Sequence, residues 1–347
     1  YEFTPPDVGS FIHTILDRFS TYLDENNLTW REVDSSWCND VISDIVDKTV
    51  EEEAGSILSS SARYRYLKNR LKRVITRAVY LIALHIKRGG FNPAGHAVSF
   101  EDGGKYPPIS INLPSGENIK LIGRIDRVDT LETEDEIYVR VVDYKTGNKS
   151  FDLSDIYNGL ELQLLVYLDA ILDYVSKNSS KPVLPGGILY FRIDDPMIKT
   201  NGEIKDEEIE NEIMKSLKMK GLLLSDVKVI REMDKDIDGY SIIIPAMIKA
   251  DGGLGSSSSV ADEEKFDALR KHVKDVTIKL CEDMLKGNIM ISPYKNKDRT
   301  PCSFCTYKAI CRFDVSIKEN TYRIIRNKSK DEIWETITEN TSAKEEK

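Results

Sequence analysis

The amino-acid sequence predicts an α/β protein in which a central mixed β-sheet is flanked by helices. Three observations support this fold class. Residues 1–90 place apolar side chains at helical spacing. Residues 96–145 change to short β-rich runs broken by Pro, Gly and acidic turns, which indicates a strand meander. Helical periodicity returns over residues 153–176, and Gly186–Ile193, GGILYFRI, then predicts a further strand.

Each remaining element is expected from its local pattern. The initial helical region divides into segments over about Val8–Leu23, Asp40–Leu58 and Ala62–Lys87. The polar stretch Pro196–Glu264 is interpreted as an insertion, with a short helix over Asp206–Ser216, a strand-like SIIIPAMI and a flexible DGGLGSSSS. A helix over Ala261–Leu285 follows, and the tail is expected to be disordered beyond about Glu339.

The expected organisation is a single domain with five segments. A helical region, a sheet core, an insertion, a helix with a cysteine-bearing segment and a polar tail occupy 1–90, 91–195, 196–260, 261–315 and 316–347. The chain begins at Tyr1 and not at Met, and a Pro-Pro-Asp segment leads straight into a helical pattern. We therefore expect a fragment of a longer protein.

Composition places the chain among globular proteins. It has 347 residues, 40% apolar content and no apolar run long enough for a membrane span. Its start does not resemble a secretion signal, so we expect a cytoplasmic protein without a membrane partner. The net charge of −9 argues against a protein that coats nucleic acid by charge alone.

One stretch is nevertheless strongly basic. Residues 62–77, ARYRYLKNRLKRVITR, contain no acidic residue and interleave two tyrosines with Lys and Arg. Two interpretations stay open: a helix that follows DNA phosphates, or a solvated helix face that packs through its Leu and Ile side chains. The candidate DNA contacts are Arg63, Arg65, Arg70 and Arg73.

Two strand ends carry a candidate catalytic site. GRIDRVD contains Asp126, and VVDYKTG contains Asp143 and Lys145. Side chains two apart on a strand point to the same face, so Asp143 and Lys145 project together while Tyr144 faces the other way. An adjacent strand can bring Asp126 beside them. Two converging carboxylates suit Mg²⁺ or Mn²⁺, and a nearby lysine can orient or deprotonate an attacking water. For a lone D-x-K, an ion pair at a turn is the alternative.

The order of these motifs is similar to that of a known family. G-x-x-D, then D-x-K, then a helix with Gln163 and Tyr167 resembles the RecB-like branch of the PD-(D/E)XK nuclease superfamily. Gln163 and Tyr167 are four residues apart and share a helix face. The resemblance implies a restriction-endonuclease-like core and a nuclease whose catalytic residues are Asp126, Asp143, Lys145, Gln163 and Tyr167.

An upstream motif adds a metal ligand. Gly9–Leu16 resembles the G-x-x-x-H helix motif of the same branch. The resemblance implies a divalent ion bound by His13, Asp126, Asp143 and the backbone carbonyl of Tyr144. The remaining histidines match no motif of the family and receive no role: His85, His96 and His272.

Three late cysteines, Cys302, Cys305 and Cys311, form C-x2-C-x5-C. Thiols at this spacing favour a metal or cluster over disulfides, and zinc and iron–sulfur both stay possible. The segment resembles the iron–sulfur staple of nucleases in this branch, in which a fourth, early cysteine completes a [4Fe–4S] cluster. This chain has no cysteine before its first helix motif, so we expect an incomplete or absent cluster. Cys38 and Cys281 are expected to be ordinary buried thiols.

The motifs together resemble the nuclease subunits of the AddAB helicase–nuclease family over nearly the whole chain. The resemblance implies a Mg²⁺-dependent DNA nuclease that works with an AddA subunit on double-strand breaks. The chain contains no G-x-x-x-x-G-K-[ST] phosphate loop, so no motor is expected in it. Two alternatives stay open: a non-catalytic module that guides DNA, and a repair exonuclease of the same superfamily outside AddAB.

Overall fold

The computed structural model describes residues 5–54, 61–147, 149–199, 202, 205–326 and 328–345. Where the sequence predicted a single domain, the chain forms two compact units, and each is described by itself. The first unit contains residues 1–109, 122–151 and 167–266. The second contains residues 110–121, 152–166 and 267–347.

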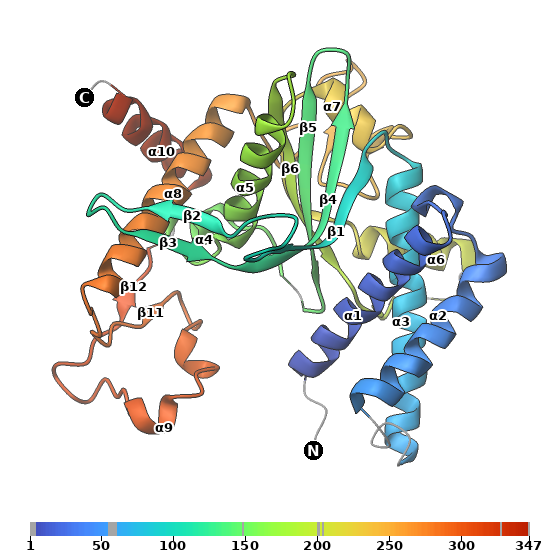
Figure 1. Cartoon of the computed structure of the whole chain (residues 1–347), viewed down its shortest axis with the longest axis horizontal. Coiled ribbons are helices and arrows are strands. Elements are labelled where there is room, and N and C mark those ends of the chain that lie inside the picture. Colours follow the sequence, from blue (N-terminus) through green and yellow to red (C-terminus); the bar gives the residue numbers. More distant parts are fainter. Residues whose placement is uncertain are drawn as a thin grey trace. The chain divides into compact units, whose positions relative to one another are not determined.

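The first unit is built on a six-stranded sheet (Figure 1). Its strand order is β1 (Asn92–Phe100), β4 (Gly123–Glu132), β5 (Ile137–Lys145), β6 (Val183–Arg192), β7 (Lys220–Leu224) and β10 (Val260–Ala261). The β1–β4, β4–β5 and β6–β7 pairs are antiparallel, whereas β5–β6 and β7–β10 are parallel. The predicted mixed sheet is therefore confirmed.

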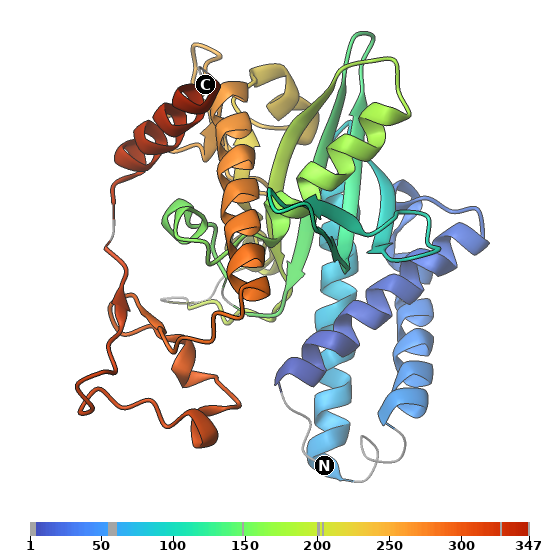
Figure 2. The ribbon, with the colours of Figure 1, turned by 60° about the vertical axis from the view of Figure 1, so that its left-hand side comes forward.

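Three helices pack on one another within this unit (Figures 1 and 2): α1 (Pro5–Glu25), α2 (Ser35–Thr49) and α3 (Ala62–Lys87). α1 forms because an apolar residue recurs every fourth position and faces the core: Phe11, Ile15, Phe19 and Leu23 are at most 1% exposed. α3 has the predicted bounds. The helix predicted from Asp40 instead begins at Ser35, because the Asp34 carboxylate accepts the Ser36 N–H and caps it.

The stretch interpreted as an insertion is integrated into the sheet. β7 pairs with β6, and β10 pairs with β7. The short helix is confirmed as α6 (Asp206–Ser216), and α7 (Val227–Met233) follows β7. SIIIPAMI was wrongly predicted as a strand. Buried Ser241 accepts the N–H groups of Ile243 and Ile244, which turns the chain and leaves only Met247–Ile248 as β9, paired with β8 (Gly239–Tyr240).

The single helix predicted over residues 153–176 is two helices. α4 (Leu153–Tyr157) and α5 (Gln163–Lys177) are separated by a turn in which Gly159 has a φ of 76°. A backbone angle in this left-handed region ends a helix and favours glycine.

The second unit has a small core of its own. The hairpin of β2 (Ile109–Asn112) and β3 (Asn118–Leu121) packs Ile111 and Leu113 against Cys281 of α8 (Glu263–Leu285), which has nearly the predicted bounds. The tail was predicted to be disordered, but α10 (Lys330–Glu345) is a helix that packs against α4 through its buried Ile333 and Ile337. The remaining elements are β11 (Tyr294–Lys295), η4 (Pro301–Ser303), α9 (Lys308–Cys311) and β12 (Arg323–Ile324).

Across the ranges that the structure describes, no helix combines the length and apolar character needed to cross a membrane.

A histidine lies between α3 and the sheet of the first unit. His85 is 2% exposed, and its ring meets the Phe191 ring edge-on at 5.2 Å. Burial lowers the pKa of His85 well below its usual range, and the charges of Arg127 and Arg140 lower it further. The folded protein therefore holds His85 neutral.

This neutral state predicts acid sensitivity. Below a pH of about 6.5 the unfolded chain binds a proton at residue 85 that the folded chain excludes, so stability is lost as the pH falls. Relative to His85→Gln, the wild type should lose up to about 1.4 kcal/mol of unfolding free energy per pH unit below that value. Urea titrations at pH 7.5 and 5.0 measure the difference. His96→Gln, at a partly exposed position, is the control, and identical pH dependence in wild type and His85→Gln would contradict the interpretation.

Candidate active site

Asp126 and Asp143 lie on neighbouring antiparallel strands of the first unit. In the β4–β5 ladder Arg127 pairs with Val142, and Asp126 and Asp143 are the next residues along each strand. Side chains directly opposite in such a ladder share a face. The register therefore brings the two carboxylates to one place, as their strand-end positions predicted.

The Asp126 carboxylate has two partners. Its Oδ2 accepts the backbone N–H of Tyr144 at 2.7 Å, which extends the strand ladder through a side chain. Its Oδ1 lies 2.8 Å from Nδ1 of His13, which α1 supplies from 113 positions earlier in the chain. The two side chains are 10% and 24% exposed, so this pair remains accessible from solvent.

Asp143 is the more buried carboxylate. Its Oδ2 lies 2.5 Å from Nζ of Lys145, and the two side chains are 8% and 28% exposed. The predicted shared face of Asp143 and Lys145 is therefore confirmed. Burial raises the pKa of Asp143, and the charge of Asp126 raises it further, while Lys145 and His13 oppose the rise. Two negative groups that repel each other in a partly dry place are suited to a bound cation.

The donor set fits a hard divalent ion. Two carboxylates and one imidazole match the oxygen and nitrogen ligands that Mg²⁺ or Mn²⁺ accept. Within the described residues, no three His, Cys, Asp or Glu side chains are spaced as a metal site. Asp126 is instead bound to His13, and Asp143 to Lys145.

Two motif glycines set close approaches around these residues. A Cβ on Gly9, the first residue of the G-x-x-x-H motif, would lie 3.4 Å from Thr146 Oγ1, so α1 runs close to the end of β5. A Cβ on Gly123 would overlap the Tyr167 hydroxyl and lie 3.1 Å from two carbons of its ring. The Tyr167 ring also stacks on Phe100 at 5.9 Å. Gly123 and Tyr167 therefore share one packed space at the start of β4.

The sequence matches the family model of the PD-(D/E)XK nuclease superfamily over residues 1–312. The chain belongs to this superfamily. The predicted membership and the predicted restriction-endonuclease-like core are confirmed. Nucleases of the superfamily generally use divalent metal ions.

Relatives of the chain are larger proteins. It is 51% identical over 339 residues to an ATP-dependent helicase/deoxyribonuclease subunit of Acetivibrio thermocellus, which covers 98% of the chain and 30% of the relative. The subunit of the same name from Clostridium novyi is 52% identical over 337 residues, covering 97% and 30%. That of Clostridium acetobutylicum is 51% identical over 337 residues, covering 97% and 29%. The chain thus spans about 30% of the length of these relatives, and the predicted resemblance is confirmed.

The two residues of the superfamily's helix motif fall in different units. Gln163 opens α5 and belongs to the second unit, whereas Tyr167, one turn later, belongs to the first. Tyr167 lies against Gly123, three residues before Asp126. The catalytic roles of Gln163 and Tyr167 stay predictions.

The basic helix divides into free and paired arginines. Arg63, Arg65 and Arg70 are exposed on α3 and form no ion pair with any residue that the structure describes. Arg73 donates to Asp195 through Nε at 3.1 Å and Nη2 at 2.5 Å, and Arg77 binds the other oxygen at 2.6 Å. The charge of Arg73 is already offset within the protein, which makes it a weaker candidate for DNA than predicted.

The cysteines fall into two classes. Cys38 and Cys281 are buried, at 0% and 6% exposure, as expected. The three late cysteines are exposed or partly exposed, in and after η4 and at the end of α9: Cys302, Cys305 and Cys311. No thiol cluster spaced as a metal site occurs in the described parts of the chain.

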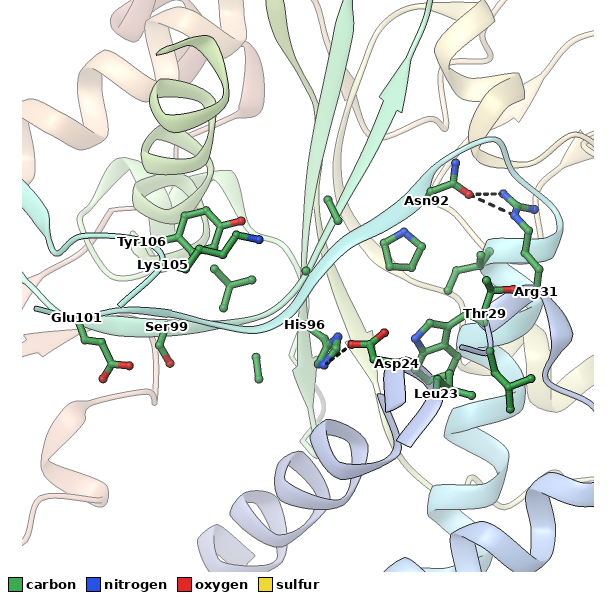
Figure 3. A pocket seen from close by; sticks show the side chains of 18 residues that line it. Leu23, Asp24, Thr29, Arg31, Asn92, His96, Ser99, Glu101, Lys105 and Tyr106 are labelled. Atoms are coloured by element: carbon green, nitrogen blue, oxygen red, sulfur yellow. Dashed lines mark hydrogen bonds and ion pairs between the residues drawn. The ribbon is translucent and has the colours of Figure 1, made fainter. Parts of the chain in front are cut away.

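A pocket of about 780 Å³ lies along β1, outside the carboxylate site (Figure 3). Residues 92–99 form one wall, and the end of α1 and the turn around Trp30 line the rest. Figure 3 shows His96 facing Asp24, at 3.6 Å. The acidic and basic residues of the lining balance: Asp24, Glu101, Arg31 and Lys105. Balanced charge is unlike a phosphate-binding groove.

Sequence reasoning missed a buried charged group on the other face of the catalytic strands. Arg127, Asp129 and Arg140 are at most 1% exposed, and Asp129 contacts both arginines. One signal could have revealed it. Arg127 and Asp129 alternate with Asp126 and must face away from it, into the side on which a helix packs.

The shared space of Gly123 and Tyr167 predicts a rescue. Gly123→Ala should lower the unfolding free energy by about 1–3 kcal/mol through overpacking. Adding Tyr167→Phe should restore part of the loss, because the hydroxyl is the nearest obstacle. Urea titrations of the single and double variants measure the effect, and additive losses would contradict it. Tyr167→Phe alone separates packing from catalysis: activity lost at unchanged stability would support a catalytic hydroxyl.

Proposed function

We propose that this chain is the metal-dependent DNA nuclease domain of a helicase–nuclease that processes double-strand break ends for recombinational repair. The observation that carries the proposal is the pair of carboxylates on β4 and β5 with Lys145 bound to one of them. The family match and the names of the relatives support the same activity. DNA is then the substrate, an AddA subunit the partner, and the cytoplasm the location.

The ligands of a Mg²⁺ or Mn²⁺ ion in this proposal are Asp126, Asp143, His13 and the Tyr144 carbonyl. The ion would polarise the scissile phosphate, lower the pKa of a bound water and stabilise the leaving oxygen.

The residues of the chain have separate tasks. His13 and the Tyr144 N–H hold the two oxygens of Asp126 in a fixed orientation. Lys145, 2.5 Å from Asp143, orients the attacking water or receives its proton. Gln163 and Tyr167 complete the pocket on the substrate side. The exposed Arg63, Arg65 and Arg70 contact DNA phosphates at a distance from the reaction.

Removal of the central side chains should abolish cleavage. Asp126→Ala, Asp143→Ala and Lys145→Ala should each lower the rate of single-stranded DNA cleavage by about 100-fold or more, because each removes a metal ligand or the group that handles the water. Cleavage of end-labelled DNA in Mg²⁺ or Mn²⁺, followed on gels, measures the rates.

Asp135→Ala and Lys220→Ala alter exposed residues of the same two types and serve as matched controls. Equal cleavage by wild type and all three site variants would overturn the catalytic assignment. DNA binding without cleavage in any of the proteins would favour the non-catalytic guiding module.

We also propose that Cys302, Cys305 and Cys311 bind a [4Fe–4S] cluster in the longer protein, together with a cysteine outside these 347 residues. Anaerobically purified full-length protein should then absorb near 400 nm. Serine at any of the three positions should remove the band, whereas Cys38→Ala and Cys281→Ala should keep it, since those thiols are buried elsewhere. Zinc in place of iron would refute the cluster.

A further inference from the structure

The buried charged group behind the carboxylates connects to the site through one residue. Asp129 Oδ1 lies 3.0 Å from Nε of Arg127, and Oδ2 accepts the Nε–H of Arg140 at 2.7 Å. Asp129 and Arg140 are directly opposite in the β4–β5 ladder. With His85 neutral, two arginines and one aspartate leave one uncompensated positive charge in a dry place.

The two arginines differ in what else they touch. The Arg140 guanidinium lies over the Phe91 ring, 4.6 Å from its centre, away from the carboxylates. Arg127 is next to Asp126 in sequence, and its charge acts on the Tyr144 hydroxyl, a diagonal neighbour across the ladder. No nitrogen of Arg127 meets hydrogen-bond geometry within the described residues, so these are charge contacts.

Tyr144 links this contact to the site. Its ring is held by Phe191, edge-on at 5.9 Å, and by Arg127, and its backbone N–H donates to Asp126. A rotation of the Tyr144 side chain would therefore move the peptide that fixes the Asp126 carboxylate. Burying three charges destabilises a protein relative to apolar residues of similar size unless their arrangement has another use.

We propose that Arg127 is a positioning residue that acts through the Tyr144 side chain to hold Asp126 and the Tyr144 peptide in the geometry that binds the divalent ion. The proposal rests on the proposed metal-dependent function. Groups of this kind, which orient ligands without touching the ion, change metal affinity by about 10–100-fold when removed.

The chain supplies a matched pair of variants. Arg127→Met leaves Asp129 paired with Arg140, and Arg140→Met leaves Asp129 paired with Arg127, so each removes one buried positive charge and keeps a neutral pair. Only Arg127→Met loses the contact with Tyr144. Asp129→Asn would leave two buried arginines unpaired and is unsuitable, because it is expected to unfold the protein.

The experiment measures Mn²⁺ binding by calorimetry and thermal unfolding in parallel. Arg127→Met and Tyr144→Phe should each weaken Mn²⁺ binding about 10-fold, and the double variant no further, because the two residues act as one unit. Arg127→Lys should restore part of the affinity. Arg140→Met should bind Mn²⁺ like the wild type.

The outcomes separate the two proposals. Equal weakening in Arg127→Met and Arg140→Met, or none in either, overturns the positioning role while leaving the proposed nuclease intact. Additive losses in the double variant also overturn it. Failure of the wild type itself to bind Mn²⁺, or wild-type affinity in Asp126→Ala, overturns the metal site and the positioning role together.

Discussion

The antiparallel register between β4 and β5 decides which residues form the site. Arg127 pairs with Val142, Asp129 with Arg140, and the Asp126 carboxylate continues the ladder by accepting the Tyr144 N–H. Side chains alternate along a strand, so a slip of one residue would send a strand's whole set to the opposite face. Asp126 would then lie against the helices and Arg127 at the site.

Charges are arranged differently on the two faces of this strand pair. The site face collects two carboxylates whose repulsion, together with burial, raises the pKa of Asp143. The opposite face carries one excess positive charge beside a histidine that burial keeps neutral. An apolar core would fill the same space at lower electrostatic cost, but it would specify the strand register less strictly.

The elements with a strong local pattern were predictable. α3 and α6 have the predicted bounds, and the strands of Asp126 and Asp143 lie where alternation placed them. The errors have local physical causes that periodicity does not register. Asp34 caps α2 early, Ser241 turns a β-rich run, and Gly159 divides a helix through its positive φ. α10 forms because packing against α4 stabilises a polar sequence that would otherwise stay unfolded.

The sequence by itself determined the fold class, the superfamily, and that Asp143 and Lys145 share a face, because motif order and strand alternation are local properties of the chain. Only the tertiary structure decided that His13 meets Asp126 from 113 positions away and that Tyr167 fills the space left by Gly123. It also decided that Arg127 lies buried beneath the site, in contact with Tyr144. Such contacts depend on how separate elements pack, and residue spacing along one chain carries no record of that packing.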